Sequence, residues 1–149
     1  MTRHRERGVS TVEAAFVLPI LFTILLTFFD FGSWELQSTQ GAAAARDGAR
    51  VAVLHYAAAD VPASSDYAAI KAAVTKRLAG QGYSSLTVTC VGPSTTTPLA
   101  GGCSAATVDN NRVLVTISWT RQPWSPIGTL LGPRTITGTA TMTINGLPT

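Results

Sequence analysis

The chain has 149 residues, of which 46% are hydrophobic and 13% are charged, and its formal net charge is +3. This length suffices for one membrane helix and one small domain. The positive charge comes from the N-terminal head, which contains Arg3, Arg5 and Arg7, and no cluster of Lys and Arg with interleaved aromatic residues occurs elsewhere. We therefore expect no nucleic-acid partner.

A basic head followed by an apolar run predicts a membrane-inserted N-terminus. An uncharged segment runs from Ala14 to Phe29, and the stretch from Val9 to Phe29 reaches about 31 Å as a helix, close to the roughly 30 Å of a bilayer's hydrocarbon core. Short segments rich in Lys and Arg stay cytoplasmic. We therefore expect a cytoplasmic leader at 1–8, a transmembrane helix at 9–31, and an exported domain at 32–149 outside the inner (cell) membrane, periplasmic or extracellular.

Helix-forming residues continue beyond the apolar run. No proline occurs between Ser33 and Ala59, alanine is dense there, and Pro62 supplies a stop. These features predict one long helix from about Val9 to about 59. Its exported half carries small residues that would allow a sheet or another helix to approach closely. A second helix is expected over 66–79, capped by Ser64 or Ser65.

Alternation of apolar residues with period two follows the second helix. It predicts strands near 84–91, 112–120 and 134–144, and threonine on their other faces suits a half-exposed antiparallel sheet. We therefore predict an α+β fold in which the long helix and the short helix pack on a small antiparallel sheet of about three strands. The loop at 122–133 is expected to be ordered around Trp124.

The two cysteines, Cys90 and Cys103, both lie in the part expected to be exported. An even count in an oxidising compartment predicts a disulfide, worth roughly 3 kcal/mol in the chain-entropy model. The alternative is a pair of free buried thiols.

Residues for catalysis are scarce. The histidines are His4, in the leader, and His55, near the end of the long helix, so a metal site on the exported side would need carboxylates to complete it. No Gly-x-Ser-x-Gly turn and no glycine-rich phosphate loop is present. We expect that the chain is not an enzyme and that it has no catalytic residue, metal or cofactor. We expect His55 to be a surface or interface residue.

Glu13 is the anomaly of the apolar segment, because a carboxylate inside a spanning helix costs roughly 2.5–3.5 kcal/mol. A secretory signal peptide would have a shorter apolar core and a small-residue cleavage site. A simple anchored module leaves Glu13 unexplained. In a prepilin-like subunit, cleavage after Gly8 makes Val9 the first residue and Glu13 the fifth, so the new amino group lies about one helical turn from the carboxylate.

Three blocks of sequence resemble the TadE-like family. They are Gly8, Val9, Glu13, Ala14, Phe16, Val17, Leu18 and Pro19; then Asp30-Phe31-Gly32; then Ala44-Ala45-Arg46-Asp47-Gly48-Ala49-Arg50. The family typically shows E-x-A-hydrophobic-x-x-P, an acid-Phe-Gly at the membrane exit, and A-A-R-[DE]-G-A-R downstream. TadE-like proteins are pilin-like subunits, either pseudopilins or minor pilins, of the tight-adherence (type IVb-like) pilus system. TadF-like proteins share much of this pattern, so TadF remains an alternative.

The resemblance implies processing after Gly8 by a prepilin peptidase, with Val9 as the new N-terminus and Glu13 as the pairing acid for assembly. The implied partners are the peptidase, membrane lipid and other pilus-assembly subunits, namely the pilin, a TadF-like protein and the inner-membrane platform.

Two interpretations stay open for Arg46, Asp47 and Arg50, which lie at helical spacing. They are either a solvated set of ion pairs worth a few tenths of a kcal/mol or a docking surface for another pilus component. The alternative function for the whole chain is a single-pass, membrane-anchored extracellular binding module that is not processed as a prepilin. Trp34, Trp119 and Trp124 would be its candidates for stacking on a ligand.

Overall fold

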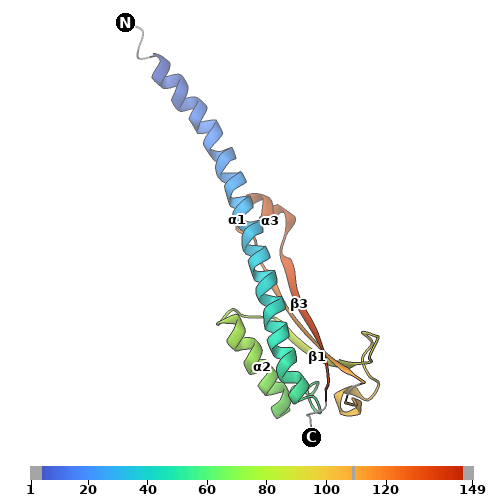
Figure 1. Ribbon diagram of the computed structural model, residues 1–149. Coiled ribbons are helices and arrows are strands. Elements are labelled where there is room, and N and C mark those ends of the chain that lie inside the picture. The colour runs from blue at the N-terminus through green and yellow to red at the C-terminus, as the bar shows by residue number, and fades with distance from the viewer. Residues whose placement is uncertain (1–4, 109, 146–149) are drawn as a thin grey trace. The chain divides into compact units, whose positions relative to one another are not determined.

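The computed structural model describes residues 5–108 and 110–145. Its helices are α1 (Arg5–Leu54), α2 (Ser65–Leu78) and α3 (Pro126–Leu131), and its strands are β1 (Ser85–Val91), β2 (Arg112–Arg121) and β3 (Arg134–Thr143) (Figure 1). A 3-10 turn, η1, covers Gly102–Ala105. The α+β fold predicted from the sequence is confirmed, with one long N-terminal helix, shorter helices and a three-stranded antiparallel sheet.

The chain divides into two compact units. The apolar unit consists of Met1–Glu35 and Arg121–Arg134, and the sheet unit consists of Leu36–Thr120 and Thr135–Thr149. Helix α1 contributes its N-terminal part to the apolar unit and its C-terminal part to the sheet unit.

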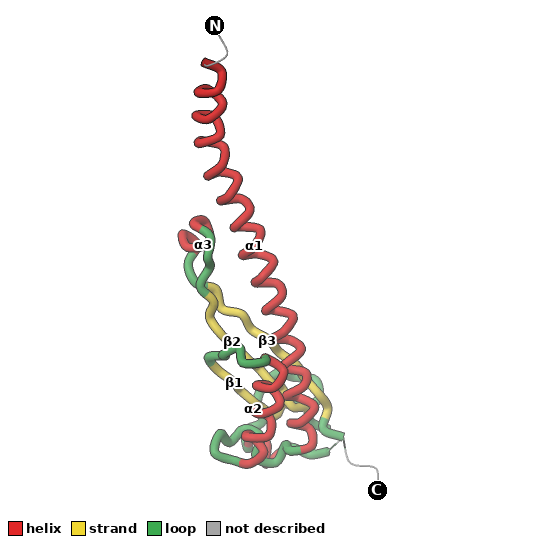
Figure 2. The backbone as a smooth tube through the Cα atoms, turned by 90° about the vertical axis from the view of Figure 1, so that its left-hand side faces the viewer, coloured by secondary structure: helices red, strands yellow, loops and turns green. Residues whose placement is uncertain are grey.

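The sheet unit is built on strands in the order β1-β2-β3 (Figure 2). Strand β1 pairs with β2 in antiparallel register, from Ser85 opposite Ser118 to Val91 opposite Arg112. Alternate residues of β2 are buried, as the period-two pattern predicted: Val113, Val115, Ile117 and Trp119. The core also contains Ala44, Ala45, Ala49 and Ala52 of α1 and Ile70, Val74 and Leu78 of α2.

Small residues set the distance from α1 to the sheet and to α2. A Cβ atom built at Gly41 would lie 2.5 Å from the indole ring of Trp119, and one built at Gly48 would lie 2.8 Å from a methyl carbon of Val74. A Cβ atom at Gly138 on β3 would overlap the carbonyl group of Gly41. The close approach that the small residues predicted is therefore confirmed.

The sequence predicted that the long helix continues to about Ala59, but α1 ends at Leu54. The following residues form turns, in which the N–H of Ala59 donates to the carbonyl of Tyr56 at 3.1 Å. Asp66 accepts the N–H of Ala58 at 3.3 Å, and the hydroxyl of Ser64 donates to the Ala58 carbonyl at 2.6 Å. These side-chain partners satisfy backbone groups that a longer helix would have paired, so they override the helix propensity of the alanines.

Candidate functional site

The apolar part of α1 exposes its large side chains. Its most apolar 18-residue window has a mean hydropathy of 2.3, and none of that window is buried inside the chain. Phe16, Phe28 and Phe29 are each more than 70% exposed, at 73%, 71% and 71%. A helix of this length and composition can cross a bilayer, because all its backbone hydrogen bonds are internal and its surface is apolar. This agrees with the prediction of a single-pass membrane protein.

The residues predicted for processing lie at the start of this helix. Gly8 and Val9 are helical, whereas residues 1–4 of the predicted leader and the side chains up to Ser10 lie outside the described residues. Glu13 is exposed, and no ion pair to it occurs among the described side chains. Val9 and Glu13 are four residues apart on one helix and so share a face. Cleavage after Gly8 stays a prediction.

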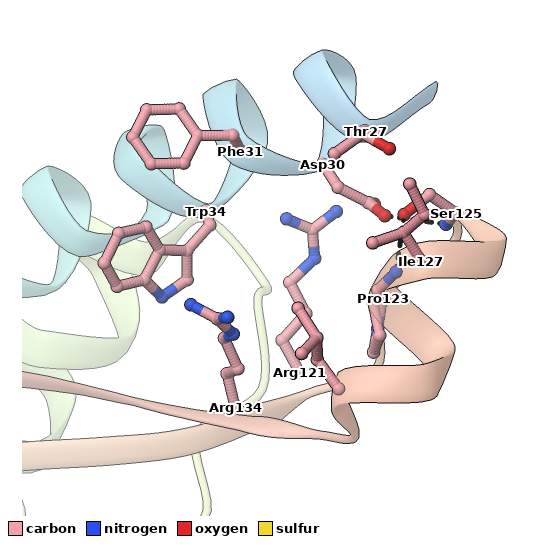
Figure 3. A pocket seen from close by; sticks show the side chains of 11 residues that line it. Thr27, Asp30, Phe31, Trp34, Arg121, Pro123, Ser125, Ile127 and Arg134 are labelled. Atoms are coloured by element: carbon pink, nitrogen blue, oxygen red, sulfur yellow. Dashed lines mark hydrogen bonds between the residues drawn. The ribbon is translucent and has the colours of Figure 1, made fainter. Parts of the chain in front are cut away.

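Asp30, at the end of the apolar run, holds the segment that contains α3 (Figure 3). Its carboxylate accepts the backbone N–H of Trp124 at 3.0 Å and the N–H of Ser125 at 2.6 Å. Ser125 is fully buried, and its hydroxyl caps α3 by accepting the N–H of Gly128 at 2.9 Å. Asp30, the acid of the second sequence block, therefore has a structural role.

The loop at 122–133 is ordered, as predicted, and contains α3, but the prediction that the Trp124 side chain orders it is wrong. The Trp124 side chain is 78% exposed, so its backbone and not its ring is fixed. The order comes from Asp30 and from the Ser125 cap followed by Pro126. A serine directly before a proline is a typical start of a helix and was the available sequence signal for α3.

A cavity of about 130 Å³ lies beside Asp30 within the apolar unit. Its charged lining residues besides Asp30 are Arg121 and Arg134, and Figure 3 shows both guanidinium groups pointing toward α1. Arg121 donates to the hydroxyl of Ser33 at 2.6 Å. Trp34 also lines the cavity, and its indole N–H is buried without a hydrogen-bond partner among the described residues.

The third block of the resemblance is largely explained by packing within the sheet unit. Its alanines at 44, 45 and 49 are fully buried. Arg46 is exposed, and Asp47 lies 3.4 Å from Arg50 and 3.6 Å from Arg77 of α2. These ion pairs are solvent-exposed, which agrees with the solvated interpretation. A docking role for Arg46, Asp47 and Arg50 stays a prediction.

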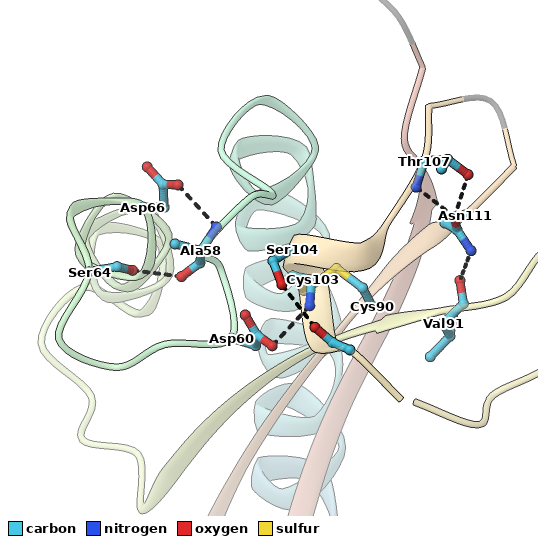
Figure 4. The surroundings of a disulfide bond; sticks show 11 residues. Ala58, Asp60, Ser64, Asp66, Cys90, Val91, Cys103, Ser104, Thr107 and Asn111 are labelled. Carbon is cyan, nitrogen blue, oxygen red and sulfur yellow. Dashed lines mark hydrogen bonds between the residues drawn. A yellow bond between two sulfur atoms is a disulfide. The ribbon is translucent and has the colours of Figure 1, made fainter. Parts of the chain in front are cut away.

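The predicted disulfide is confirmed: Cys90 and Cys103 are bonded, with their Cα atoms 4.9 Å apart (Figure 4). The bond joins β1 to η1. Asp60 supports it by accepting the backbone N–H of Cys103 at 2.9 Å. Gly102 has φ +65°, and a side chain there would also meet the Asp60 carboxylate. The pairing rules out two free thiols in this structure.

His55 and the tryptophans occupy different surroundings. His55 is exposed, with its Nδ1 3.6 Å from a carboxylate oxygen of Asp66. Trp119 belongs to the core and donates to the Gln37 side chain at 3.3 Å.

No group of three or more His, Cys, Asp or Glu suited to a metal ion occurs within 5–108 and 110–145. The expectation that the chain is not an enzyme stays a prediction.

Comparison with curated proteins and with solved structures finds no match. A family model described as TadE-like protein matches residues 8–50. This range begins at Gly8 and ends at Arg50, so it contains all three blocks on which the resemblance was based. Over residues 8–50, therefore, the chain is similar to the TadE-like family.

Proposed function

We propose that this chain is a pilin-like membrane protein of the tight-adherence pilus system, acting in pilus assembly as a minor pilin or pseudopilin. The observation that carries the proposal is the TadE-like match over residues 8–50, which coincides with a helix whose N-terminal part is apolar and exposed. The partners on this proposal are a prepilin peptidase, the pilin, a TadF-like protein, the inner-membrane platform and membrane lipid.

In this proposal, the peptidase cleaves after Gly8 on the cytoplasmic side. The cut removes the arginines of the leader and converts the Val9 nitrogen into a positively charged amino group. Glu13 lies four residues further along the helix, so the two opposite charges share one face. Each charge lowers the cost of placing the other in lipid, either within one subunit or between neighbouring subunits.

The processing step is tested by mass spectrometry of the full chain extracted from membranes of cells with an active prepilin peptidase. We expect Val9 as the N-terminal residue. A chain that retains Met1 or begins at Thr2 would support the unprocessed anchored module, and a start between 33 and 46 would indicate a signal peptide. Both of these results would overturn the proposal.

A matched pair of glycine variants sharpens this test. Gly8→Val should block the cut, because the residue before the scissile bond must be small for the peptidase to act. Gly32→Val is the control, since no atom lies within 4 Å of a Cβ built at Gly32 on the same helix. The control should be processed like the parent chain.

The role of Glu13 is tested separately by Glu13→Ala. We expect this variant to insert into membranes normally and to reduce the number of pili, because the variant removes the charge that pairs with the new amino group. Glu35→Ala is the control, since Glu35 is also an exposed acid of α1 but follows the apolar run. Unchanged piliation in Glu13→Ala would remove the special role of this residue.

A further inference from the structure

The segment around α3 exposes several large apolar side chains. Leu130 is 87% exposed, and Trp124, Ile127 and Leu131 are also exposed. We call these four residues the α3 patch. Contiguous exposed apolar side chains on a folded protein mark a surface that contacts an apolar environment or a partner.

The α3 patch lies at the level where the apolar run of α1 ends. Asp30 is the first charged residue after Glu13, and its carboxylate binds the backbone of Trp124 and Ser125. Thr27 and Leu131 line the same cavity beside Asp30. If α1 crosses a bilayer through the run that ends at Phe29, this level is the boundary between acyl chains and headgroups, where tryptophan is preferred.

The charges of the same segment suit the headgroup region. Arg121 and Arg134 flank the segment and line the cavity on the side of α1 (Figure 3). Asp30, the one acid among the cavity-lining residues, is already bound by two backbone N–H groups. Two guanidinium groups next to an apolar patch therefore match lipid phosphates next to acyl chains.

We propose that the α3 patch is a second membrane contact of this chain. Its side chains lie at the headgroup–acyl boundary of the leaflet from which α1 emerges, and Arg121 and Arg134 face lipid phosphates. The occupant of the patch is the bilayer itself, because the patch continues the exposed apolar surface of α1 within one unit. The inference requires α1 to lie in the bilayer, but it does not require cleavage after Gly8.

The test uses the full chain reconstituted into vesicles of phosphatidylcholine and phosphatidylglycerol that carry bromine at a chosen depth. The emission of Trp124 is obtained as the difference between the parent chain and Trp124→Phe. We expect this emission to be blue-shifted, strongly quenched by bromine near the headgroup and less quenched by bromine near the chain ends. Omitting phosphatidylglycerol should weaken the quenching, and Arg134→Gln should abolish that lipid dependence.

Two exposed leucines give a matched comparison. Leu130→Glu places a charge in the proposed boundary and should largely abolish quenching of Trp124. Leu54→Glu makes the same change at a leucine that is 67% exposed in the sheet unit, and it should leave the quenching unchanged. Because both side chains are exposed, neither variant removes core packing.

Phe22→Trp, in the middle of the apolar run, reports on α1 alone. If this tryptophan is quenched by deep bromine while Trp124 emits as in water, the α3 patch does not contact lipid and the inference fails, although the membrane helix stands. If Trp124 becomes shielded only on addition of the pilin, the patch binds protein and the inference also fails. If neither tryptophan is quenched, both the inference and the membrane placement of α1 fail.

Discussion

Replacing Gly138 by alanine is expected to destabilise the sheet unit. A methyl group at this position of β3 would overlap the carbonyl group of Gly41 and lie 2.9 Å from the backbone nitrogen of Ala42. These atoms belong to the backbone of α1, so they cannot rotate away as a flexible side chain would. The helix and the strand must therefore move apart to accept the methyl group.

The magnitude follows from two opposing effects. Replacing glycine by alanine in a strand stabilises the fold by about 0.5–1 kcal/mol, because alanine loses less conformational freedom on folding than glycine does. Overpacking a well-packed contact costs typically about 1–3 kcal/mol, and the upper end applies because the obstacle is backbone. The expected net loss is therefore about 2 kcal/mol. For a domain of this size, each kcal/mol lowers the midpoint of thermal unfolding by about 4–8 °C.

The assay is thermal unfolding of the full, oxidised chain in detergent micelles, followed by fluorescence. Trp119 is a suitable reporter because it is buried against Gly41. Gly32→Ala is the matched control: it makes the same change where no atom lies within 4 Å, and it should not lower the midpoint. A Gly138→Ala chain that unfolds at or above the temperature of the parent chain would refute the argument that this contact fixes the helix–sheet distance.

Three further predictions concern the sheet unit. Replacing Cys90 and Cys103 together by serine should lower the free energy of unfolding by roughly 3 kcal/mol, measured by urea denaturation, and addition of reductant should give the same loss in the parent chain only. Ser64→Ala should cost about 1 kcal/mol, because it removes the N-cap that accepts the Tyr67 N–H at 3.0 Å; Ser104→Ala, at an exposed serine, should change the free energy of unfolding much less in the same titration. Burial raises the pKa of the Tyr67 hydroxyl above its ordinary value near 10. The stability due to this group is therefore complete below pH 10 and falls as the pH rises through the pKa of the folded state. Tyr67→Phe should flatten that part of the profile of stability against pH. An unchanged profile would show that Tyr67 is not the titrating group.

The elements predicted best from the sequence are those specified by local patterns. The alternation from Val113 to Trp119 identified the buried face of β2, because side chains of a strand point to opposite faces in turn. The disulfide followed from having two cysteines in the part of the chain expected to be exported. The extent of helix across Gly41 and Gly48 was also predictable, since no proline interrupts it and small residues tolerate close packing.

The features that were missed depend on individual hydrogen bonds between side chains and backbone, which no periodic pattern shows. Asp30 accepts the N–H of Trp124 across 94 residues, and no periodic pattern connects those positions. The end of α1 at Leu54 likewise depends on Asp66 and Ser64, which capture the backbone of Ala58. In both cases a hydrogen bond from a side chain to the backbone outside the helix helps to decide where a helix starts or stops, and propensity alone cannot show it.

The three blocks of the TadE-like resemblance differ in the physical reason for their residues. The alanines at 44, 45 and 49 are buried within the sheet unit, and Asp30 anchors the α3 segment, so these positions are explained by the fold of a single chain. Glu13 is exposed on an apolar helix and contributes to no core among the described residues. A residue that is unfavourable in lipid and outside the folded core is best explained by the charge pairing proposed above, within one subunit or between neighbouring subunits. Glu13→Ala should therefore leave the midpoint of thermal unfolding unchanged while it reduces piliation. Asp30→Ala should instead loosen the α3 segment, which is detected as faster proteolysis between Arg121 and Arg134. If Glu13→Ala instead lowered the unfolding midpoint, Glu13 would belong with the fold-determining positions and its assignment to assembly would be wrong.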